Sequence, residues 1–486
     1  MHRQSKPSGW RLVEAGLTVA FLLSTAATAA ETTASELPFV FNSGQYSRYK
    51  PLSEYSRPPS RCTVEQVIVL QRGGASLPDS KLGTSIQASL AKVVGKGNYS
   101  RTEMDFLGNY TFDMGSNGAL LPYGEAQSKQ AGVQVRKRYC HSKGLTESEC
   151  ANYWISTTDS SALIDSAKNW ANGLMEGTGK STRSPRIIPE GDHLNNTLAA
   201  KCPKLVSSVP SAQQQWRDVW TPAVIQRLQS GQSYGLNSTD IINFAHLCAL
   251  ESLATSDLSP FCDLFYPSEW SSIEYDADLE KYYSHSYGAP LSRSLAVGYL
   301  HELLTRLTKS PSFVEKDRTT VNNTSDARES TFPLDRSLYL DFTSDDQLLA
   351  LLTLLNLFHD APLSPTLPCP MRSFVTSRLI PFGASLVVER LACSGNGFWD
   401  DLAAKFSGLP TRFVRVVVND RVMNLAGICP EDELAESDTI CRLVAFHKSL
   451  TPTLQEATKE FARCAYVPAN LWEGLPRKKF QSGLGI

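Results

Sequence analysis

Residues Val64–Lys81, VEQVIVLQRGGASLPDSK, contain a strand, a turn and the approach to a helix. The apolar run Val64–Leu70 predicts a buried strand, and Ala88–Val94 has the spacing of an amphipathic helix. The turn between them, Arg72–Pro78, reads RGGASLP. Strands that alternate with helices predict an α/β sandwich, and open sheets of this kind place their sites beyond the carboxyl ends of strands. The turn is therefore the first candidate site.

This turn resembles the Arg-His-Gly-x-Arg-x-Pro motif of the histidine acid phosphatase family, which includes the fungal phytases. Arg72, Gly74 and Pro78 match the motif. Gly73 stands where the family has its nucleophilic histidine, and Ser76 stands where it has a second phosphate-binding arginine. The resemblance implies the phosphoglycerate-mutase-like fold of histidine phosphatases, with an inserted α-helical domain, but not the family's chemistry.

Two more segments resemble site motifs of the family. In Tyr339–Asp346, YLDFTSDD, Ser344 replaces the second histidine and Asp345 keeps the acidic residue. In Tyr153–Ala167, Ser156 stands at the position of a third arginine. Further segments resemble the helical domain and last hairpin of fungal phytases: Leu258–Trp270, Leu279–Pro290, Val297–Leu307, Pro381–Val387 and Val414–Val422.

Compared with the family motifs, the site lacks residues that phosphohistidine catalysis needs. In the family, a histidine attacks phosphorus, arginines neutralise the phosphoryl oxygens and a carboxylic acid protonates the leaving alcohol. Each charge-assisted bond to phosphate contributes roughly 1.5–3 kcal/mol, so the replacements weaken phosphate binding strongly. Because Arg72 and Asp345 offset each other, we expect a nearly neutral, roomier pocket in which Arg72 is the one fixed cation. Asp345 is a candidate acid, or else a cap of the next helix or a partner of Arg72.

The histidines and serines offer no replacement nucleophile. His359-Asp360 repeats the family dipeptide but lies at the far end of the apolar helix predicted at Leu348–Phe358, so we do not expect it to be catalytic. His285 and His301 are expected to be structural. The three serines at the site positions have no evident His/Asp partners, which argues against a serine hydrolase.

Composition and charge limit the class of protein. The chain has 486 residues, 42% of them hydrophobic and 20% charged, and a formal net charge of −2. These values are ordinary for a soluble globular protein of two packed domains. They give no reason to expect nucleic acid or a membrane as partner. We expect no metal or cofactor, a small-molecule ligand, and a monomer or homo-oligomer.

The N-terminus has the order of a secretory signal peptide. Basic residues precede the apolar stretch Ala15–Leu23, and small residues follow with a cleavage site near Ala29. We therefore expect a secreted or lumenal protein without a stable membrane anchor. Six N-glycosylation sequons agree with this compartment: Asn98, Asn109, Asn195, Asn237, Asn322 and Asn323.

Eleven cysteines favour disulfides over zinc, since none forms a paired C-x-x-C arrangement. Spacing alone leaves their connectivity open. The family resemblance implies Cys62–Cys393, Cys202–Cys464, Cys248–Cys262 and Cys429–Cys441. Cys140 and Cys150 are left as a plausible local pair, and Cys369 is then odd.

The chain divides by composition and pattern into a signal peptide, an extended N-terminal arm, two parts of an α/β domain, a helical domain between them and a tail. The signal peptide is predicted at 1–30, the arm at 31–61 and the tail at 471–486. The two parts of the α/β domain are predicted at 62–167 and 326–470, with the helical domain at 168–325 between them.

Three functions fit the sequence. The first is a pseudophosphatase that keeps its cleft as a binding surface. The second is a repurposed enzyme that acts on an uncharged or carboxylated molecule in a secretory or specialised-metabolite pathway. The third is an acid phosphomonoesterase or phytase with an atypical site. The sequence does not name the ligand.

Overall fold

The computed structural model describes residues 42–99, 101–141, 144–190, 196–205, 209–319, 323–394 and 411–464. The predicted signal peptide, the tail, residues 31–41 of the arm, the sequons at Asn195 and Asn322, and the side chain of Asn323 lie outside the described residues.

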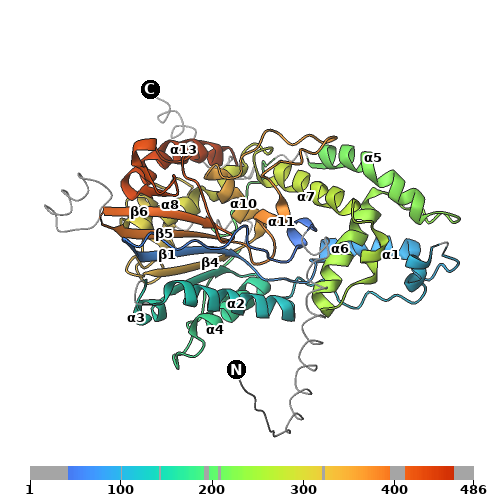
Figure 1. Cartoon of the computed structure of the whole chain (residues 1–486), viewed down its shortest axis with the longest axis horizontal. Coiled ribbons are helices and arrows are strands. Elements are labelled where there is room, and N and C mark those ends of the chain that lie inside the picture. The colour runs from blue at the N-terminus through green and yellow to red at the C-terminus, as the bar shows by residue number, and fades with distance from the viewer. Residues whose placement is uncertain are drawn as a thin grey trace, which may run out of the picture.

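A mixed sheet forms the centre of the molecule, as the sequence predicts (Figure 1). Strand β1 (Cys62–Arg72) pairs in parallel with β4 (Leu338–Thr343) and antiparallel with β5 (Ser385–Cys393). Within the described residues the strand order is β3-β2-β4-β1-β5-β6-β9-β8, with β7 paired to β6. The other strands are β2 (Trp154–Thr158), β3 (Arg186–Ile188), β6 (Thr411–Val418), β7 (Arg421–Val422), β8 (Leu434–Ala435) and β9 (Ile440–Arg442).

Helices cover both faces of this sheet, which explains why β1 is apolar along most of its length. Val67 and Val69 belong to one hydrophobic cluster, and the alternate residues Ile68 and Leu70 belong to the other. On one face lie α2 (Pro122–Tyr139), α3 (Glu147–Ala151) and α4 (Ser161–Met175); on the other lie α8 (Val297–Thr308), α10 (Asp345–Leu354) and α13 (Leu443–Cys464) (Figure 1).

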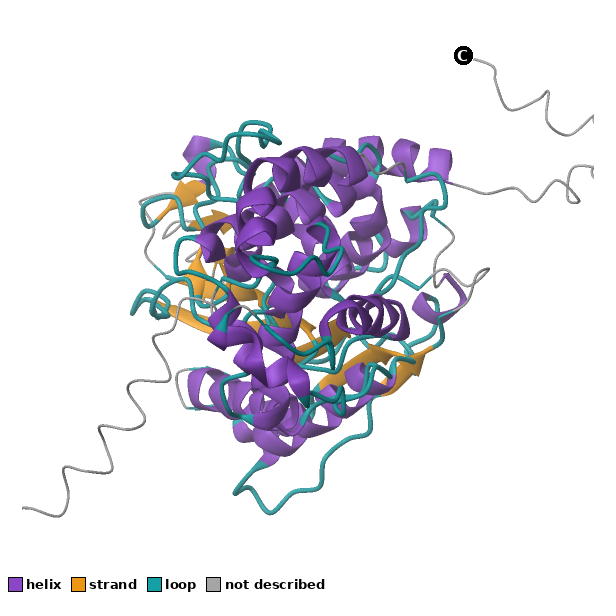
Figure 2. Cartoon of the chain, turned by 90° about the vertical axis from the view of Figure 1, so that its right-hand side faces the viewer, coloured by secondary structure: helices purple, strands orange, loops and turns teal. Residues whose placement is uncertain are grey.

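A helical part stands beyond one end of the sheet (Figures 1 and 2). It contains α1 (Ser80–Val93), α5 (Val209–Leu228), α6 (Ser238–Thr255) and α7 (Glu269–His285). The short elements are α9 (Asn323–Asp326), α11 (Thr376–Leu379), η2 (Gly44–Tyr46), η3 (Thr102–Gly108), η4 (Pro260–Leu264), η5 (Ser292–Ala296), η6 (Val314–Lys316) and η7 (Glu431–Glu433).

The bounds predicted for the inserted helical domain, 168 and 325, can be placed on the described elements. The boundary at 168 falls inside α4, and the sheet continues to β3, which pairs with β2. The predicted helical domain also includes α8, which instead packs against α13 over the sheet. Helical periodicity alone does not distinguish a helix that covers a sheet from one that packs on other helices, because both bury one apolar face.

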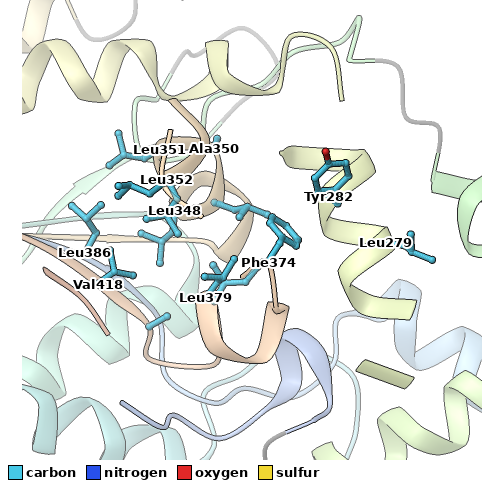
Figure 3. Close-up of a cluster of buried hydrophobic side chains, with 14 of the residues drawn as sticks. Leu279, Tyr282, Leu348, Ala350, Leu351, Leu352, Phe374, Leu379, Leu386 and Val418 are labelled. Atoms are coloured by element: carbon cyan, nitrogen blue, oxygen red, sulfur yellow. The ribbon is translucent and has the colours of Figure 1, made fainter. Parts of the chain in front are cut away.

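Helix α10 joins the sheet to the helical part. Its side chains Leu348 and Leu352 point toward Leu386 of β5 and Val418 of β6 (Figure 3). The helix ends at Leu354, four residues before the predicted end at Phe358. Backbone φ angles of 55° at Asn356 and 57° at Phe358 are left-handed, so the chain turns away there.

Five disulfides connect distant parts of the chain, and all four pairs implied by the family resemblance are present. Cys140–Cys150 forms the local fifth bridge, and Cys369 is free and exposed. Cys62–Cys393 and Cys202–Cys464 span 331 and 262 residues. Bridges that close such long loops restrict the unfolded chain most.

Residues 42–61, the described part of the N-terminal arm, pack along the body. Tyr55 donates to the buried carboxylate of Glu389 at 2.8 Å, and Arg415 donates both to Glu389 at 2.6 Å and to the Ser56 carbonyl at 3.0 Å. The backbone N–H of Leu52 also donates a hydrogen bond to the carbonyl of Asn419. The arm is therefore fixed by buried polar bonds.

We predict that Asp341→Ala destabilises the protein by about 3–5 kcal/mol, because it leaves the buried Arg306 guanidinium without its carboxylate partner. Urea unfolding would measure the loss. Asp165→Ala is the control, since its exposed pair with Lys168 contributes about 0–1 kcal/mol. The double variant Arg306→Met, Asp341→Leu should regain most of the loss. Equal effects of Asp341→Ala and Asp165→Ala would contradict the prediction.

Candidate functional site

The two site motifs meet at the carboxyl edge of the β1–β4 pair. Arg72 lies opposite Thr343 in the parallel register, so the turn after β1 and the start of α10 leave the sheet side by side. We call residues Arg72–Ser76 and Ser344–Asp346 the edge site. This arrangement is the one expected for sites of open α/β sheets.

Arg72 ties together three segments around the edge site. Its side chain is buried, and its Nη1 donates to the carbonyl of Gln45 at 2.6 Å and to the carbonyl of Ile380. The guanidinium also lies 4.4 Å from the ring centroid of Phe382. Its Nη2 is 3.9 Å from Asp345 Oδ2, a long ion pair. The close hydrogen bonds of the Arg72 guanidinium are thus donated to backbone carbonyls of the protein itself.

The closer cationic partner of Asp345 is Lys281, which the sequence interpretation missed. Lys281 extends from α7, with Nζ 2.9 Å from Asp345 Oδ2 and 2.8 Å from Asp346 Oδ1. His285, one turn further along α7, has Nδ1 3.3 Å from Asp346 Oδ1. The expectation that Arg72 is the one fixed cation was wrong. Two cations and two carboxylates therefore meet here.

A pattern in the sequence could have indicated Lys281. Asp278, Lys281 and His285 recur at spacings of three and four residues, which places them on one face of a helix. The segment also falls within Leu279–Pro290, which resembles the helical domain of the family. Only the packing of α7 against α10 shows which charges this face meets.

The charges around Asp345 keep it ionised. Burial alone would raise the pKa of this carboxyl, but Lys281 and then Arg72 outweigh burial and hold the pKa well below its usual range. Burial would likewise lower the pKa of Lys281, yet Asp345 and Asp346 raise it well above its usual value. Asp345 is therefore suited to accept a hydrogen bond and not to donate a proton.

Ser344 caps helix α10. Its side-chain oxygen accepts a hydrogen bond from the backbone N–H of Gln347 at 3.3 Å. The sequence interpretation gave this role to Asp345 as one alternative, whereas Asp345 is the first residue inside the helix. Serine is among the best N-cap residues. The residue at the position of the family's second histidine thus has a structural use.

The space beside Gly73 is filled. A Cβ atom at position 73 would lie 2.7 Å from Cδ2 of Leu163 and 3.4 Å from Oγ of Ser166, both on α4. A Cβ at Gly74 would lie 2.4 Å from the carbonyl oxygen of Gly124 on α2. Helix α4 thus packs an apolar side chain against Gly73, and the roomier pocket stays a prediction.

The remaining predicted site residues, Ser156 and Ser76, contact other parts of the protein. Ser156 is buried in β2 opposite Asp341, two residues before the register position of Thr343, and its hydroxyl accepts from the indole N–H of Trp154 at 2.8 Å. Ser76 is half-buried and forms an isolated bridge with Leu120.

The His359-Asp360 pair lies away from the edge site and has structural partners. The His359 ring stacks on Tyr287 with centroids 4.3 Å apart. Asp360 accepts from the hydroxyl of Ser373 at 2.9 Å and from the backbone N–H of Phe374 at 2.7 Å. His301 is buried on α8, and burial lowers its pKa.

The described residues contain neither a cluster of metal-ligating side chains nor a membrane-spanning helix. Nowhere in this part of the chain do three or more His, Cys, Asp or Glu side chains gather in a way that could hold a metal ion. None of its helices is both long and apolar enough to cross a bilayer.

Comparisons with known proteins agree with this geometry. A model of the histidine phosphatase superfamily (branch 2) matches residues 63–419. Phytase A of Aspergillus terreus is 32% identical over 433 residues, covering 84% of this chain and 87% of its own length. Phytase A of Aspergillus awamori is 31% identical over 433 residues, with coverage of 84% and 88%.

Solved structures show the same fold. The phytase from D. castellii superposes with a TM-score of 0.68 at 19% identity and covers 90% of each chain. The multiple inositol polyphosphate phosphatase of Bifidobacterium longum, solved with inositol hexasulfate, gives a TM-score of 0.60 at 13% identity. It covers 84% of this chain and 97% of its own.

The depressed pKa of Asp345 predicts a pH-dependent contribution to stability. A carboxyl whose pKa is lower in the folded state stabilises the protein fully above its unfolded pKa, about 4, and loses this effect as the pH falls toward the folded pKa. The stability difference between the parent chain and Asp345→Asn should therefore be largest near neutral pH and shrink below about pH 4. Urea unfolding at a series of pH values measures it.

Asp165→Asn is the control for this series, because Asp165 is exposed on α4 and pairs with Lys168 at the surface. Its stability difference should stay within about 0.5 kcal/mol at every pH. A difference for Asp345→Asn that does not change between about pH 2.5 and about pH 7 would show that Lys281 does not hold the carboxylate.

Proposed function

The chain belongs to branch 2 of the histidine phosphatase superfamily, and from this premise we propose that it is a member whose edge site binds a ligand without forming a phosphohistidine. In this proposal the protein is a pseudophosphatase. The fold keeps the strand ends, the start of α10 and the face of α7 together, while the groups that would attack and hold a phosphoryl group are absent from their positions.

The observation that carries the proposal is the pairing of Gly73 with Leu163. A Cβ atom at position 73 would lie 2.7 Å from Leu163 Cδ2, so a side chain there requires this half-buried leucine to shift. The loss is therefore accommodated by packing from a second element. Ser344 supports the same conclusion, because its hydroxyl serves the backbone of α10. Asp345 adds a third argument, since an ionised carboxylate does not protonate a leaving alcohol.

Charge indicates the class of ligand. Arg72 donates to backbone carbonyls, and Lys281 lies between two carboxylates, so both cations already have partners inside the protein. A polyphosphate would have to compete with these partners and would face the negative charge of Asp345 and Asp346. A neutral or singly charged molecule with hydroxyl groups suits the site better, because Asp345 can accept from a hydroxyl.

The relatives favour a second candidate function. The matched fungal proteins are named phytases, and the Bifidobacterium enzyme was solved with inositol hexasulfate, a polyanion. By this analogy the chain would be an acid phosphomonoesterase that uses an atypical nucleophile. Repurposed catalysis on a molecule without phosphate is compatible with the edge site, but no contact in it favours that reaction.

We also propose that the protein matures in the secretory pathway. Five disulfides agree with an oxidising compartment. The sequon asparagines Asn98, Asn109 and Asn237 are exposed, so an attached glycan would not disturb the core at these positions.

We predict that the purified protein releases no phosphate above background from phytate or p-nitrophenyl phosphate at acid pH. Gly73→His should remain inactive, because the phosphate-holding residues are still missing even when Leu163 shifts to make room. Adding Leu163→Ala should not be sufficient either. A chain that also carries Ser76→Arg and Ser344→His is the positive control. Turnover by the parent chain that survives Arg72→Met would contradict the proposal and favour the second candidate function.

We further predict that phytate binds no better than sulfate at equal ionic strength, measured by titration calorimetry. The physical reason is that Arg72 and Lys281 already have partners. Lys281→Met is the informative variant, since it removes the nearest cation from Asp345 and Asp346 and leaves Asp345 only its long ion pair with Arg72. Tight phytate binding that Lys281→Met abolishes would refute the neutral-site argument, even without hydrolysis.

A further inference from the structure

A groove lies on the opposite face of β1 from Arg72. Its floor is made by four side chains of β1 and β5, which pair directly across the sheet as Val69 with Val387 and Gln71 with Ser385. Because side chains alternate along a strand, Gln71 points to the α2 side while its neighbour Arg72 points to the side of Phe382. The groove is therefore separate from the edge site.

Helix α2 forms one wall of this groove. Tyr123, Gln127, Gln130, Gln134 and Arg138 follow each other at three- and four-residue spacing, so they lie along one face of the helix. The arm and the β6–β7 turn form the other side, and the cavity has a volume of about 540 Å³. This volume lies in the range of pockets that hold small organic molecules.

Gln71 presents its amide to the groove. The residue is 3% exposed and lines the groove, and its side-chain amide makes no hydrogen bond to the described residues. The amide atoms keep contact with solvent, so an occupant of the groove would take the place of water at this donor and acceptor. Gln127 differs, because its amide bonds the Ala75 N–H at 3.1 Å and the Phe382 carbonyl at 2.8 Å. Gln71 alone offers a buried donor and acceptor to an occupant.

The charged residues of the groove neutralise each other. Arg138 donates to Asp420 Oδ1 at 2.7 Å, and the Tyr49 hydroxyl donates to Asp420 Oδ2 at 3.0 Å. The guanidinium of Arg138 also lies 3.9 Å from the ring centroid of Tyr55. Because both oxygens of Asp420 accept hydrogen bonds and Arg138 pairs with Asp420, these residues offer no uncompensated charge to a ligand in the groove. The valines of the floor provide apolar contact.

We propose that this groove is a second ligand site, which binds a neutral, partly apolar small molecule carrying an amide-like donor and acceptor. The molecule pairs its donor and acceptor with the Gln71 amide and lies against Val69 and Val387. This inference does not depend on the activity of the edge site, since the two sites use opposite faces of β1.

Three probes of one shape test the proposal: 2-naphthamide, 2-acetylnaphthalene and 2-naphthoate. The amide offers a donor and an acceptor, the ketone only an acceptor, and the carboxylate a charge. Binding to the full mature chain is measured by ligand-observed NMR titration. We expect the amide to bind most tightly and the carboxylate most weakly.

Two variants locate the binding. Gln71→Leu keeps the volume but removes the amide, so 2-naphthamide loses two hydrogen bonds and the ketone loses one. Binding of 2-naphthamide should fall about a hundredfold and binding of the ketone about tenfold. Its unfolding midpoint should be unchanged or higher, because the amide has no partner to lose. Ala126→Trp, at an exposed position on the rim, should block the amide and the ketone.

Three outcomes would overturn the proposal. The first is no binding of 2-naphthamide to the parent chain. The second is binding that both variants leave unchanged, which would place the probe elsewhere. The third is tighter binding of 2-naphthoate, which would show that the groove recognises charge. Loss of phosphatase activity or its presence has no bearing on any of these results.

Discussion

The parallel pairing of β1 with β4 is the constraint on which the molecule depends. Its register sets Arg72 beside Thr343, which brings the RGGASLP turn and the start of α10 to one edge. The same strand pairs with β5 and presents alternate side chains to two helical layers. Because a one-residue shift would exchange the faces of every side chain, the edge site and the groove at Gln71 are fixed together.

Local pattern and family resemblance predicted the sheet, the edge site's turn and the disulfide pairs. These features depend on apolar runs, on a short motif and on the positions of cysteines, all of which can be recognised in the sequence itself. Lys281 and Leu163 were not predicted, since each acquires its meaning only when α7 or α4 packs against the edge. The predicted end of helix α10 at Phe358 was wrong for a different reason. The backbone becomes left-handed at Asn356 and the helix ends before it, whereas the apolar sequence continues past that residue. Tertiary packing and backbone geometry thus supply what pattern lacks.

The replaced site residues form a consistent structure. Ser344 satisfies a backbone donor of α10, Leu163 fills the volume next to Gly73, and Lys281 compensates the two carboxylates. Unpaired buried charges and voids cost free energy, so each of these contacts stabilises the fold around the edge site.

The position of β1 in the sheet also has a consequence for biosynthesis. Its neighbours β4 and β5 begin at Leu338 and Ser385, so β1 leaves the ribosome long before either exists. At about 5–20 residues per second this interval lasts on the order of tens of seconds. Throughout it the segment VEQVIVL has two unpaired edges and Cys62 has no Cys393. Productive folding in the cell therefore requires that the edges of β1 and the thiol of Cys62 avoid wrong partners until β4 and β5 have been synthesised.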